Sequence, residues 1–164
     1  MATDTDRLRT AALTRMLRGL ALGDTTSTEL VGACLDAASS GQEAAWVELD
    51  SAGARAQAAD SDARRGRAGA RGRLDGVPVA VESSLAVSGL RQTLGLGGNR
   101  AGRADGDSTV AARLRGAGAV LLGTTSMDEL GLGTLGRPAG GPGLGNPLQP
   151  GRAVGGAACG AAVA

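Results

Sequence analysis

Residues 107–123 read DSTVAARLRGAGAVLLG, and this stretch decides the fold class. Asp107 or Ser108 is placed to cap a helix, because short polar side chains accept hydrogen bonds from the first turn. Val110 and Leu114 recur at helical spacing and are expected to face inwards. The first half of the stretch therefore predicts a helix.

The second half of the stretch predicts a strand that has a partner earlier in the chain. Gly116 and Gly118 are typical of a helix end. AVLL at 119–122 and VPVAV at 77–81 each read as a short strand buried on both faces. A strand, a crossover helix and a second strand form a βαβ unit with parallel pairing. The chain is therefore expected to be of the α/β class.

The N-terminal part of the chain is predicted to be helical. TSTEL opens a helix with a capping box, in which Thr26 accepts from the backbone of Glu29 while Glu29 reaches back. Cys34 lies on the apolar stripe of this helix and is interpreted as a core residue. AWVEL at 45–49 predicts a short strand, and the alanine-rich stretch 51–65 predicts a further helix.

Composition excludes several classes of reaction. The chain has 164 residues, 29 of them glycine; all 17 basic residues are arginine and His is absent. Arginine stays protonated near neutral pH, so carboxylates and the thiols Cys34 and Cys159 are the bases that remain. A Ser-His-Asp triad, a Schiff base, a Walker lysine or a histidine metal site cannot be built from this chain alone. No cofactor and no metal site are predicted.

The N-terminus and the cysteines predict a cytoplasmic protein. MATDTDRLRTAALTRMLRGL has charges throughout and no continuous apolar stretch, unlike a signal peptide or a membrane span. The two cysteines lack CxxC spacing, which argues against a zinc site or a disulfide scaffold. The net charge of +1 gives no overall attraction to anionic lipid, so no membrane association is expected.

Residues 64–73, RRGRAGARGR, break the helical pattern and are interpreted as a mobile, solvated loop. Five arginines among glycines also suit phosphate contact, because guanidinium groups pair well with phosphate. The stretch has no aromatic residue on which a base could stack. Nucleic-acid binding is therefore the less favoured reading.

From Gly131 to Gly160 the chain is rich in glycine and proline and has no acidic residue. A segment of this length without regular structure is normally functional or disordered. GLGTLG at 131–136 matches GxGxxG formally, but it follows no strand and no acidic residue comes after it to hold a ribose. A dinucleotide site is therefore not predicted, and AACGAAVA at 157–164 reads as the start of a helix.

The length predicts one domain. We divide it into an N-terminal helical part (1–66), a βαβ core (67–130) and a Gly-rich segment (131–164).

Several stretches together resemble the front part of the amidase signature family. They are TSTEL, LDGVPVAVES, DSTVAARLRGAGAVLLGTTSMDELGLG, GNPLQP and GRAVGGAACGAAVA. That family includes the A subunit of glutamyl-tRNA amidotransferase and the allophanate hydrolases. The resemblance covers about residues 20–164 and only about the first third of a family member. It implies a partial amidase-signature fold, with N-terminal helices, a mostly parallel βαβ core and a long Gly-rich loop.

The resemblance implies amide hydrolysis by a Ser, cis-Ser, Lys triad, in which lysine draws a proton through the bridging serine. Glu82 stands at the lysine position and Ala157 at the bridging serine position. The nucleophilic serine would lie beyond Ala164. We therefore predict that no catalytic residue is intact. A carboxylate at the lysine position would also reverse the local electrostatics.

At other positions of the family motifs, some residues are replaced and others are retained. By the resemblance, Ser83 replaces an aspartate, GTTS at 123–126 replaces GKTN, and Ala158 replaces the second serine of the pair. Glu129, Asn146 and Pro147 are retained. The residues expected to line a residual pocket are Gly155, Gly156, Cys159, Gly160 and Asp128.

Two residues have alternative interpretations. Glu82 would act as a general base if it paired with Asp128 or Glu129, because paired carboxylates can divide acid and base roles. The favoured interpretation is a carboxylate that faces solvent or binds an arginine. Cys159 would have a lowered thiol pKa at a helix start, but a small core residue is favoured.

The expected function is that of a catalytically inactive, truncated amidase-signature protein, either a binding or regulatory pseudoenzyme or a degenerate fragment. One alternative is a component of an amidase or amidotransferase that hydrolyses carbon–nitrogen amide bonds. Another is nucleic-acid binding through Arg64 to Arg73. With few strands, the sheet should keep an open edge, so self-association or a protein partner is expected.

Overall fold

A computed structural model describes residues 11–41, 43–97, 102–139 and 143–164. The chain forms two compact units that interleave along the sequence. Unit 1 comprises Met1–Ala38, Asp50–Val79 and Ala112–Leu122. Unit 2 comprises Ser39–Leu49, Ala80–Ala111 and Gly123–Ala164. The predicted division of the domain into a helical part, a βαβ core and a Gly-rich segment stays a prediction.

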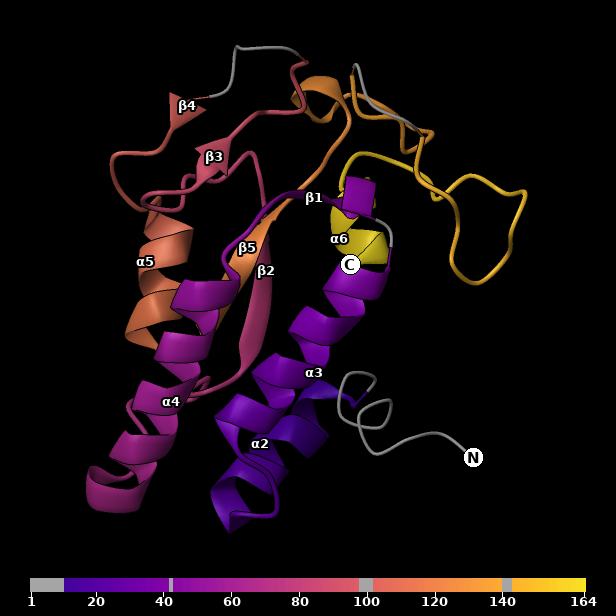
Figure 1. Ribbon diagram of the computed structural model, residues 1–164. Helices are drawn as coiled ribbons and strands as arrows, with labels where there is room; N and C mark the ends of the chain where they lie inside the picture. The colour runs from indigo at the N-terminus through magenta and orange to yellow at the C-terminus, as the bar shows by residue number, and fades with distance from the viewer. Residues whose placement is uncertain (1–10, 42, 98–101, 140–142) are drawn as a thin grey trace. The chain divides into compact units, whose positions relative to one another are not determined.

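Three helices form most of unit 1: α2 (Leu13–Leu22), α3 (Ser27–Ser40) and α4 (Ser51–Ala68) (Figure 1). All three were expected from the sequence, α4 from its alanine-rich composition. Leu20 and Leu30 pack with Val77 in one buried cluster, and Met16, Leu17, Leu74 and Val79 surround it. The helices α2 and α3 therefore pack their apolar faces against the residues that lead into the sheet.

The predicted capping box at the start of α3 is confirmed. The Thr26 backbone N–H donates to the Glu29 carboxylate at 2.8 Å, and the Glu29 N–H donates to Thr26 Oγ1 at 3.1 Å. The backbone bond from Thr26, together with the Thr25 and Thr26 hydroxyls, lowers the pKa of Glu29.

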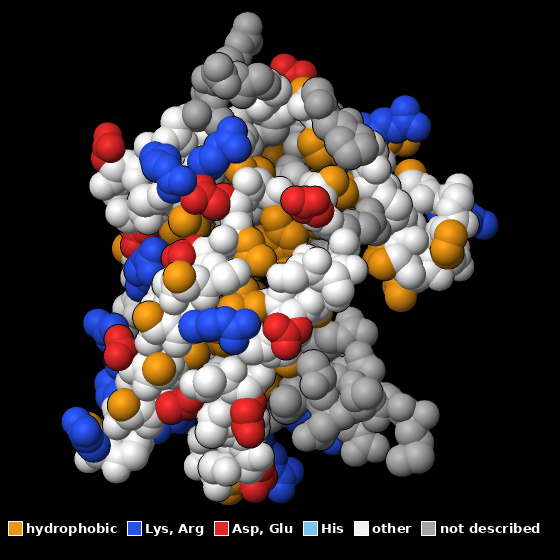
Figure 2. All heavy atoms as spheres, viewed as in Figure 1, with side chains coloured by type: hydrophobic (Ala, Val, Ile, Leu, Met, Phe, Trp, Pro, Cys, Tyr) orange, Lys and Arg blue, Asp and Glu red, His pale blue; other side chains and the backbone are white. Residues whose placement is uncertain are grey.

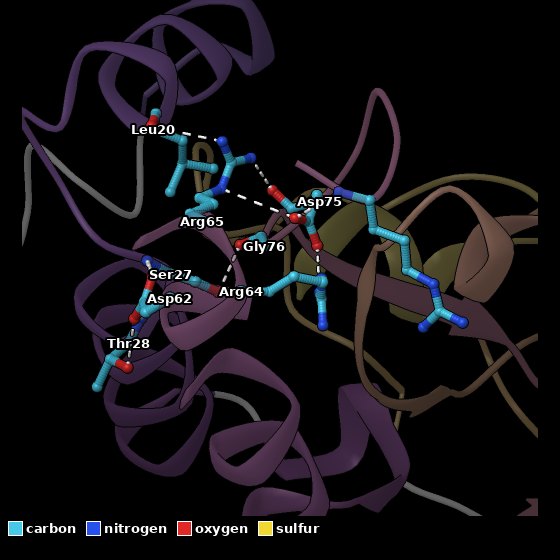
Figure 3. A network of polar contacts seen from close by, with 9 residues as sticks. Leu20, Ser27, Thr28, Asp62, Arg64, Arg65, Asp75 and Gly76 are labelled. Carbon is cyan, nitrogen blue, oxygen red and sulfur yellow. Dashed lines mark hydrogen bonds and ion pairs between the residues drawn. The ribbon is translucent and has the colours of Figure 1, made fainter. Parts of the chain in front are cut away.

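Asp62 of α4 adds a second cap to the same helix end (Figure 3). Its carboxylate accepts from the backbone N–H of Ser27 at 2.7 Å and of Thr28 at 3.0 Å, and from the Thr28 hydroxyl at 2.7 Å. Because the first N–H groups of a helix lack partners within the helix, these bonds hold α4 against the start of α3.

The helix α4 continues to Ala68, so the prediction that residues 64–73 are a solvated loop is wrong for its first half. Arg64 and Arg65, which the predicted helix over 51–65 included, both contact Asp75, whose side chain is fully buried. Arg65 also donates to the backbone carbonyls of Leu20 and Asp75 (Figure 3). A buried carboxylate needs such partners, and Arg64 and Arg65 supply them from the last part of α4.

Asp75 is held as an anion despite its burial. Burial raises the pKa of its carboxyl, but the hydrogen bond from Arg64, at 2.5 Å, and that from the Arg71 backbone N–H, at 2.9 Å, lower it by more. The net pKa lies below the usual value. Gly118 is required beside it, because its φ is +89° and an added Cβ would lie 2.7 Å from Asp75 Cα.

A three-stranded sheet runs in the order β1–β5–β2, with β1 (Trp46–Leu49), β5 (Val120–Thr125) and β2 (Pro78–Glu82). The β2–β5 pair is parallel: the Val120 N–H donates to the Val77 carbonyl, and the Ser83 N–H donates to the Thr125 carbonyl. The β1–β5 pair is antiparallel.

The predicted α/β class is confirmed, but the sheet is mixed rather than mostly parallel. The crossover helix α5 (Thr109–Gly116) links β2 to β5 and enforces parallel pairing only between those two strands. Strand β1 comes before α4 in the chain and enters the sheet in the opposite direction.

Burial of the strands follows their place in the sheet. All six residues of the central strand β5 are buried, as expected for AVLL. In β2 only Val81 is buried, so burial of VPVAV on both faces is wrong, because β2 is an edge strand.

One prediction for α5 is confirmed and another is wrong: Ser108, one of the two predicted capping residues, caps the helix, but Val110 does not face inwards. Ser108 caps the helix by accepting from the Ala111 N–H at 3.3 Å, whereas Asp107 accepts from the Ser88 N–H. The side chain of Val110 is 47% exposed, and Ala111 is the buried residue of the helix. The helix is short, and it buries the small side chain of Ala111 instead of Val110. The apolar spacing did not predict which residue would be buried.

Unit 2 consists mainly of short elements. A small hairpin pairs β3 (Arg91–Gln92) with β4 (Gly102–Arg103). The short helices are η1 (Glu43–Ala45), η3 (Glu129–Gly131) and α6 (Cys159–Val163), and α6 lies against η1 (Figure 1). The described residues between η3 and α6 contain no helix or paired strand beyond an isolated bridge of Gly145 with Ala153. Within the described part of the chain, no helix has the length and apolar character needed to span a bilayer.

Replacing Asp75 by asparagine should destabilise the protein near pH 7 by about 2–3 kcal/mol. This is less than the roughly 3–5 kcal/mol for a fully buried pair, because the Arg64 side chain is 31% exposed. Since the folded pKa of Asp75 is lowered, its contribution is complete above the unfolded value of about 3.9 and is lost as the pH falls through the folded pKa.

Urea unfolding from pH 7 down to pH 3 measures this difference. The gap between the wild type and Asp75→Asn should narrow as the pH falls. Asp105→Asn is the matched control, since Asp105 is exposed and its substitution should change the unfolding free energy little at any pH. A gap that is constant with pH would contradict an ionised Asp75.

Candidate functional site

Glu82 is the last residue of β2 and is half-buried. Its carboxylate accepts a hydrogen bond from the Ser84 hydroxyl at 2.9 Å. The next residue, Ser83, donates its backbone N–H to the Thr125 carbonyl at 3.1 Å, which ties the end of β2 to the end of β5. No arginine pairs with Glu82 among the residues that the structure describes.

Ala157 lies on the Gly-rich segment where that segment meets the residues after β5. Its carbonyl accepts from the Asp128 N–H at 2.9 Å, and the Gly160 N–H donates to the Ser126 carbonyl at 3.0 Å. Ser126 in turn donates its N–H to the Ala45 carbonyl at 2.9 Å.

These bonds bring the two predicted positions to one region of unit 2. The segment that carries Glu82 bonds to Thr125, and the segment that carries Ala157 bonds to Ser126 and Asp128. Both segments therefore meet at the carboxyl end of β5, where α/β sheets commonly place their ligands.

Asp128 organises the Gly-rich segment. Its side chain is only 3% exposed; one carboxylate oxygen accepts from the Gly136 N–H at 3.2 Å and the other from the Cys159 thiol at 3.7 Å. An added Cβ at Gly133 would collide with this carboxylate. Backbone groups that no strand or helix satisfies are thus partly satisfied by one buried anion.

The paired-carboxylate hypothesis gains no support from these contacts. The Asp128 carboxylate faces Gly136 and Cys159, and Glu129 is exposed. Among the described residues, no group of three or more His, Cys, Asp or Glu side chains is placed to hold a metal ion.

Cys159 is fully buried at the start of α6, in a cluster with Ala45 and Leu144. Burial raises the pKa of its thiol, and the Asp128 carboxylate raises it further. This is opposite to the lowered pKa that a reactive cysteine at a helix start would have. The contacts favour the interpretation of Cys159 as a small core residue. Cys34 is half-buried on α3.

An open hollow of about 430 Å³ lies beside Asp128, formed by residues of the segment from 128 to 137. Of the five residues predicted for a residual pocket, Asp128 lines this hollow, whereas Gly155, Gly156, Cys159 and Gly160 do not. Gly160 instead allows close packing, because an added Cβ would collide with the Ser126 and Ala45 carbonyls.

Sequence reasoning did not single out three leucines of the hollow. Leu130, Leu132 and Leu135 line it, and their exposed fractions are 56%, 81% and 56%. Their signal was large apolar residues recurring in a Gly-rich segment that forms no helix or strand able to bury them.

Replacing Asp128 by alanine should loosen the Gly-rich segment, because the Gly136 N–H and the Cys159 thiol would lose their buried acceptor. We expect a loss of about 1–3 kcal/mol in unfolding free energy and faster hydrogen exchange at the Gly136 amide. The matched control is Glu129→Ala, which removes an exposed carboxylate next in the chain. Equal exchange at Gly136 in both variants would show that Asp128 does not hold the segment.

The amidase family matches this chain over residues 29–164. The A subunit of the glutamyl-tRNA(Gln) amidotransferase of Anaeromyxobacter dehalogenans is 35% identical over 164 residues, covering 99% of this chain and 33% of that protein. Its counterpart from Salinispora tropica is 40% identical over 121 residues, covering 72% of this chain and 25% of that protein.

Solved structures agree with the sequence matches. A crystal structure of an amidase superposes with a TM-score of 0.85 at 30% identity, over 93% of this chain and 35% of that chain. The native peptide amidase of Stenotrophomonas maltophilia gives a TM-score of 0.78 at 28% identity, over 90% and 32%. The chain thus spans about a third or less of the length of these relatives, and it matches the N-terminal part of the amidotransferase protein.

Proposed function

We propose that this chain, which belongs to the amidase signature family, is catalytically inactive and acts as a binding or subunit-interaction module. The proposal covers a regulatory pseudoenzyme as well as a degenerate fragment. It keeps a cytoplasmic location, in line with two cysteines that form no disulfide.

One observation carries the proposal: Glu82 and Ala157 occupy the two positions where the family resemblance places a lysine and a bridging serine. The methyl group of Ala157 can neither donate nor accept a proton. The Glu82 carboxylate accepts a hydrogen bond from Ser84, and as an anion it would repel the negative charge that develops on an attacked carbonyl.

The backbone geometry supports the correspondence of these two positions. A proton relay needs its members within hydrogen-bond reach. The segments of Glu82 and Ala157 both bond to residues 125–128, so the arrangement is one in which a lysine and a serine could have approached each other.

A second candidate is a component of an amidase or amidotransferase that hydrolyses carbon–nitrogen amide bonds. It is favoured by the similarity of nearly the whole chain to relatives named as the A subunit of glutamyl-tRNA(Gln) amidotransferase. It would require groups other than those at positions 82 and 157 to move the proton.

Ammonia release from glutamine, asparagine and simple acyl amides tests the two candidates on the purified chain. We expect release equal to the buffer blank. Release above the blank that is abolished in Glu82→Gln and retained in Glu129→Gln would contradict the proposal, because it would assign catalysis to the Glu82 carboxylate. The Glu129 variant controls for a contaminating amidase.

The proposed binding role rests on open apolar surface. Strands β1 and β2 are the two edges of the three-stranded sheet, and Val79 and Ala80 of β2 are only half-buried. Exposed strand edges recruit further strands or partner proteins. We therefore infer a protein partner, or a second copy of the chain, that pairs with an edge.

Sedimentation velocity over a range of concentrations tests the binding role. We expect self-association that grows with concentration. A charge in the middle of β2, as in Ala80→Lys, should weaken it, whereas Ala112→Lys on the exposed face of α5 should not. A chain that stays monomeric at all concentrations and melts cooperatively would contradict an uncovered edge.

A further inference from the structure

Unit 1 contains a small basic pocket of about 150 Å³ that the proposed function does not use. Three arginines line it, and each comes from a different segment: Arg64 from α4, Arg71 from the turn before β2, and Arg115 from the last turn of α5. Asp60 is the one acidic side chain in its lining. The lining is therefore net positive.

The first arginine has an unused buried donor. One terminal nitrogen of Arg64 donates to the Asp75 carboxylate at 2.5 Å. Its Nε is buried and has no hydrogen-bond partner among the residues that the structure describes. Arg64 is thus fixed by Asp75 where it lines the pocket.

The second arginine is held by its backbone while its side chain stays available. The Arg71 N–H donates to Asp75 at 2.9 Å. Among the described residues, no hydrogen bond or ion pair engages its guanidinium. The backbone of Arg71 thus fixes its position, and its side chain supplies the positive charge at the pocket.

The third arginine is oriented by Gln57. One Arg115 nitrogen donates to Gln57 Oε1 at 3.3 Å, and the same oxygen accepts from the Leu121 N–H at 3.4 Å. Gln57 is fixed in turn by donating to the Gly53 carbonyl at 3.0 Å. The guanidinium is therefore partly pre-organised at the pocket, which reduces the entropy lost on binding.

We propose that this pocket binds a single phosphate group, either inorganic phosphate or the terminal phosphate of a small phosphate ester. Guanidinium groups pair with phosphate through several parallel hydrogen bonds. Donors on three segments suit a tetrahedral anion, whereas one bidentate arginine satisfies a planar carboxylate. The volume holds roughly five water molecules at about 30 Å³ each, which suits one phosphate and not a whole nucleotide.

The structure favours a discrete phosphate over a nucleic-acid strand. Arg64 and Arg65 turn towards Asp75 and backbone carbonyls instead of forming a basic track (Figure 3). On the face shown in Figure 2, basic and acidic side chains are intermixed.

Thermal unfolding of the full chain in phosphate, chloride and acetate at equal ionic strength and pH 7.5 tests the site. Phosphate alone should raise the melting temperature in a saturable manner, because it binds the folded state. Arg71→Gln and Arg115→Gln should each weaken the apparent phosphate affinity by roughly tenfold or more. Arg71→Gln keeps the backbone bond to Asp75, so its fold should be unchanged.

Arg113→Gln is the matched control, because Arg113 is exposed on the same helix as Arg115 and does not line the pocket. It should keep the affinity of the wild type. Equal stabilisation by chloride or acetate, or equal phosphate affinity in Arg71→Gln and the wild type, would overturn the proposal. If the variants fail to fold, the ³¹P signal of phosphate is measured with and without the wild-type chain. Broadening of the signal by the chain would support the site, and its absence would overturn the site.

Two further ligands distinguish the source of the phosphate. Glycerol phosphate that binds more tightly than inorganic phosphate would support the site and assign it to an ester, and weaker binding would support the free anion. A single-stranded 12-nucleotide RNA that binds far more tightly than either, with a steep salt dependence, would overturn the single-phosphate site in favour of nucleic acid.

Discussion

Unit 1 depends on the burial of one carboxylate. Asp75 has no exposed surface, and an ion in such a position is tolerated only with charged or hydrogen-bonding partners around it. Arg64 and Arg65 supply them from α4, and the Arg71 N–H supplies another from the turn. The length of α4, the path of the turn and the glycine at 118 all follow from accommodating this group.

Unit 2 also contains a buried carboxylate, that of Asp128, but its partners are a backbone N–H and a thiol instead of arginines. Its Gly-rich segment has few side chains to bury, so backbone bonds to the residues after β5 and the buried Asp128 carboxylate hold it. Glycines at 133 and 160 permit an approach that any side chain would block. The Gly-rich composition suggested a segment without fixed contacts, but hydrogen bonds to Ser126 and Asp128 hold it.

These attachments do not depend on the side chains at positions 82 and 157. Ala157 contributes its carbonyl to the contact with Asp128, and Gly160 contributes its N–H to the contact with Ser126. Neither bond depends on a hydroxyl at position 157. Likewise the end of β2 is fixed by the backbone of Ser83, whichever side chain stands at position 82. The contacts that hold both segments are therefore made by backbone atoms and leave the side chains at positions 82 and 157 uninvolved.

The sequence alone determined the local elements and the family. The capping box of Thr26 and Glu29, the helix and strand of 107–123 and the family motifs depend on neighbours within a few residues or on a linear pattern. Only the tertiary structure decided the antiparallel entry of β1, the pairing of Arg64 with Asp75 and the raised pKa of the Cys159 thiol. Each of these depends on groups brought together from distant positions, and neither propensity nor spacing records which partner a buried charge, an edge strand or a thiol will meet.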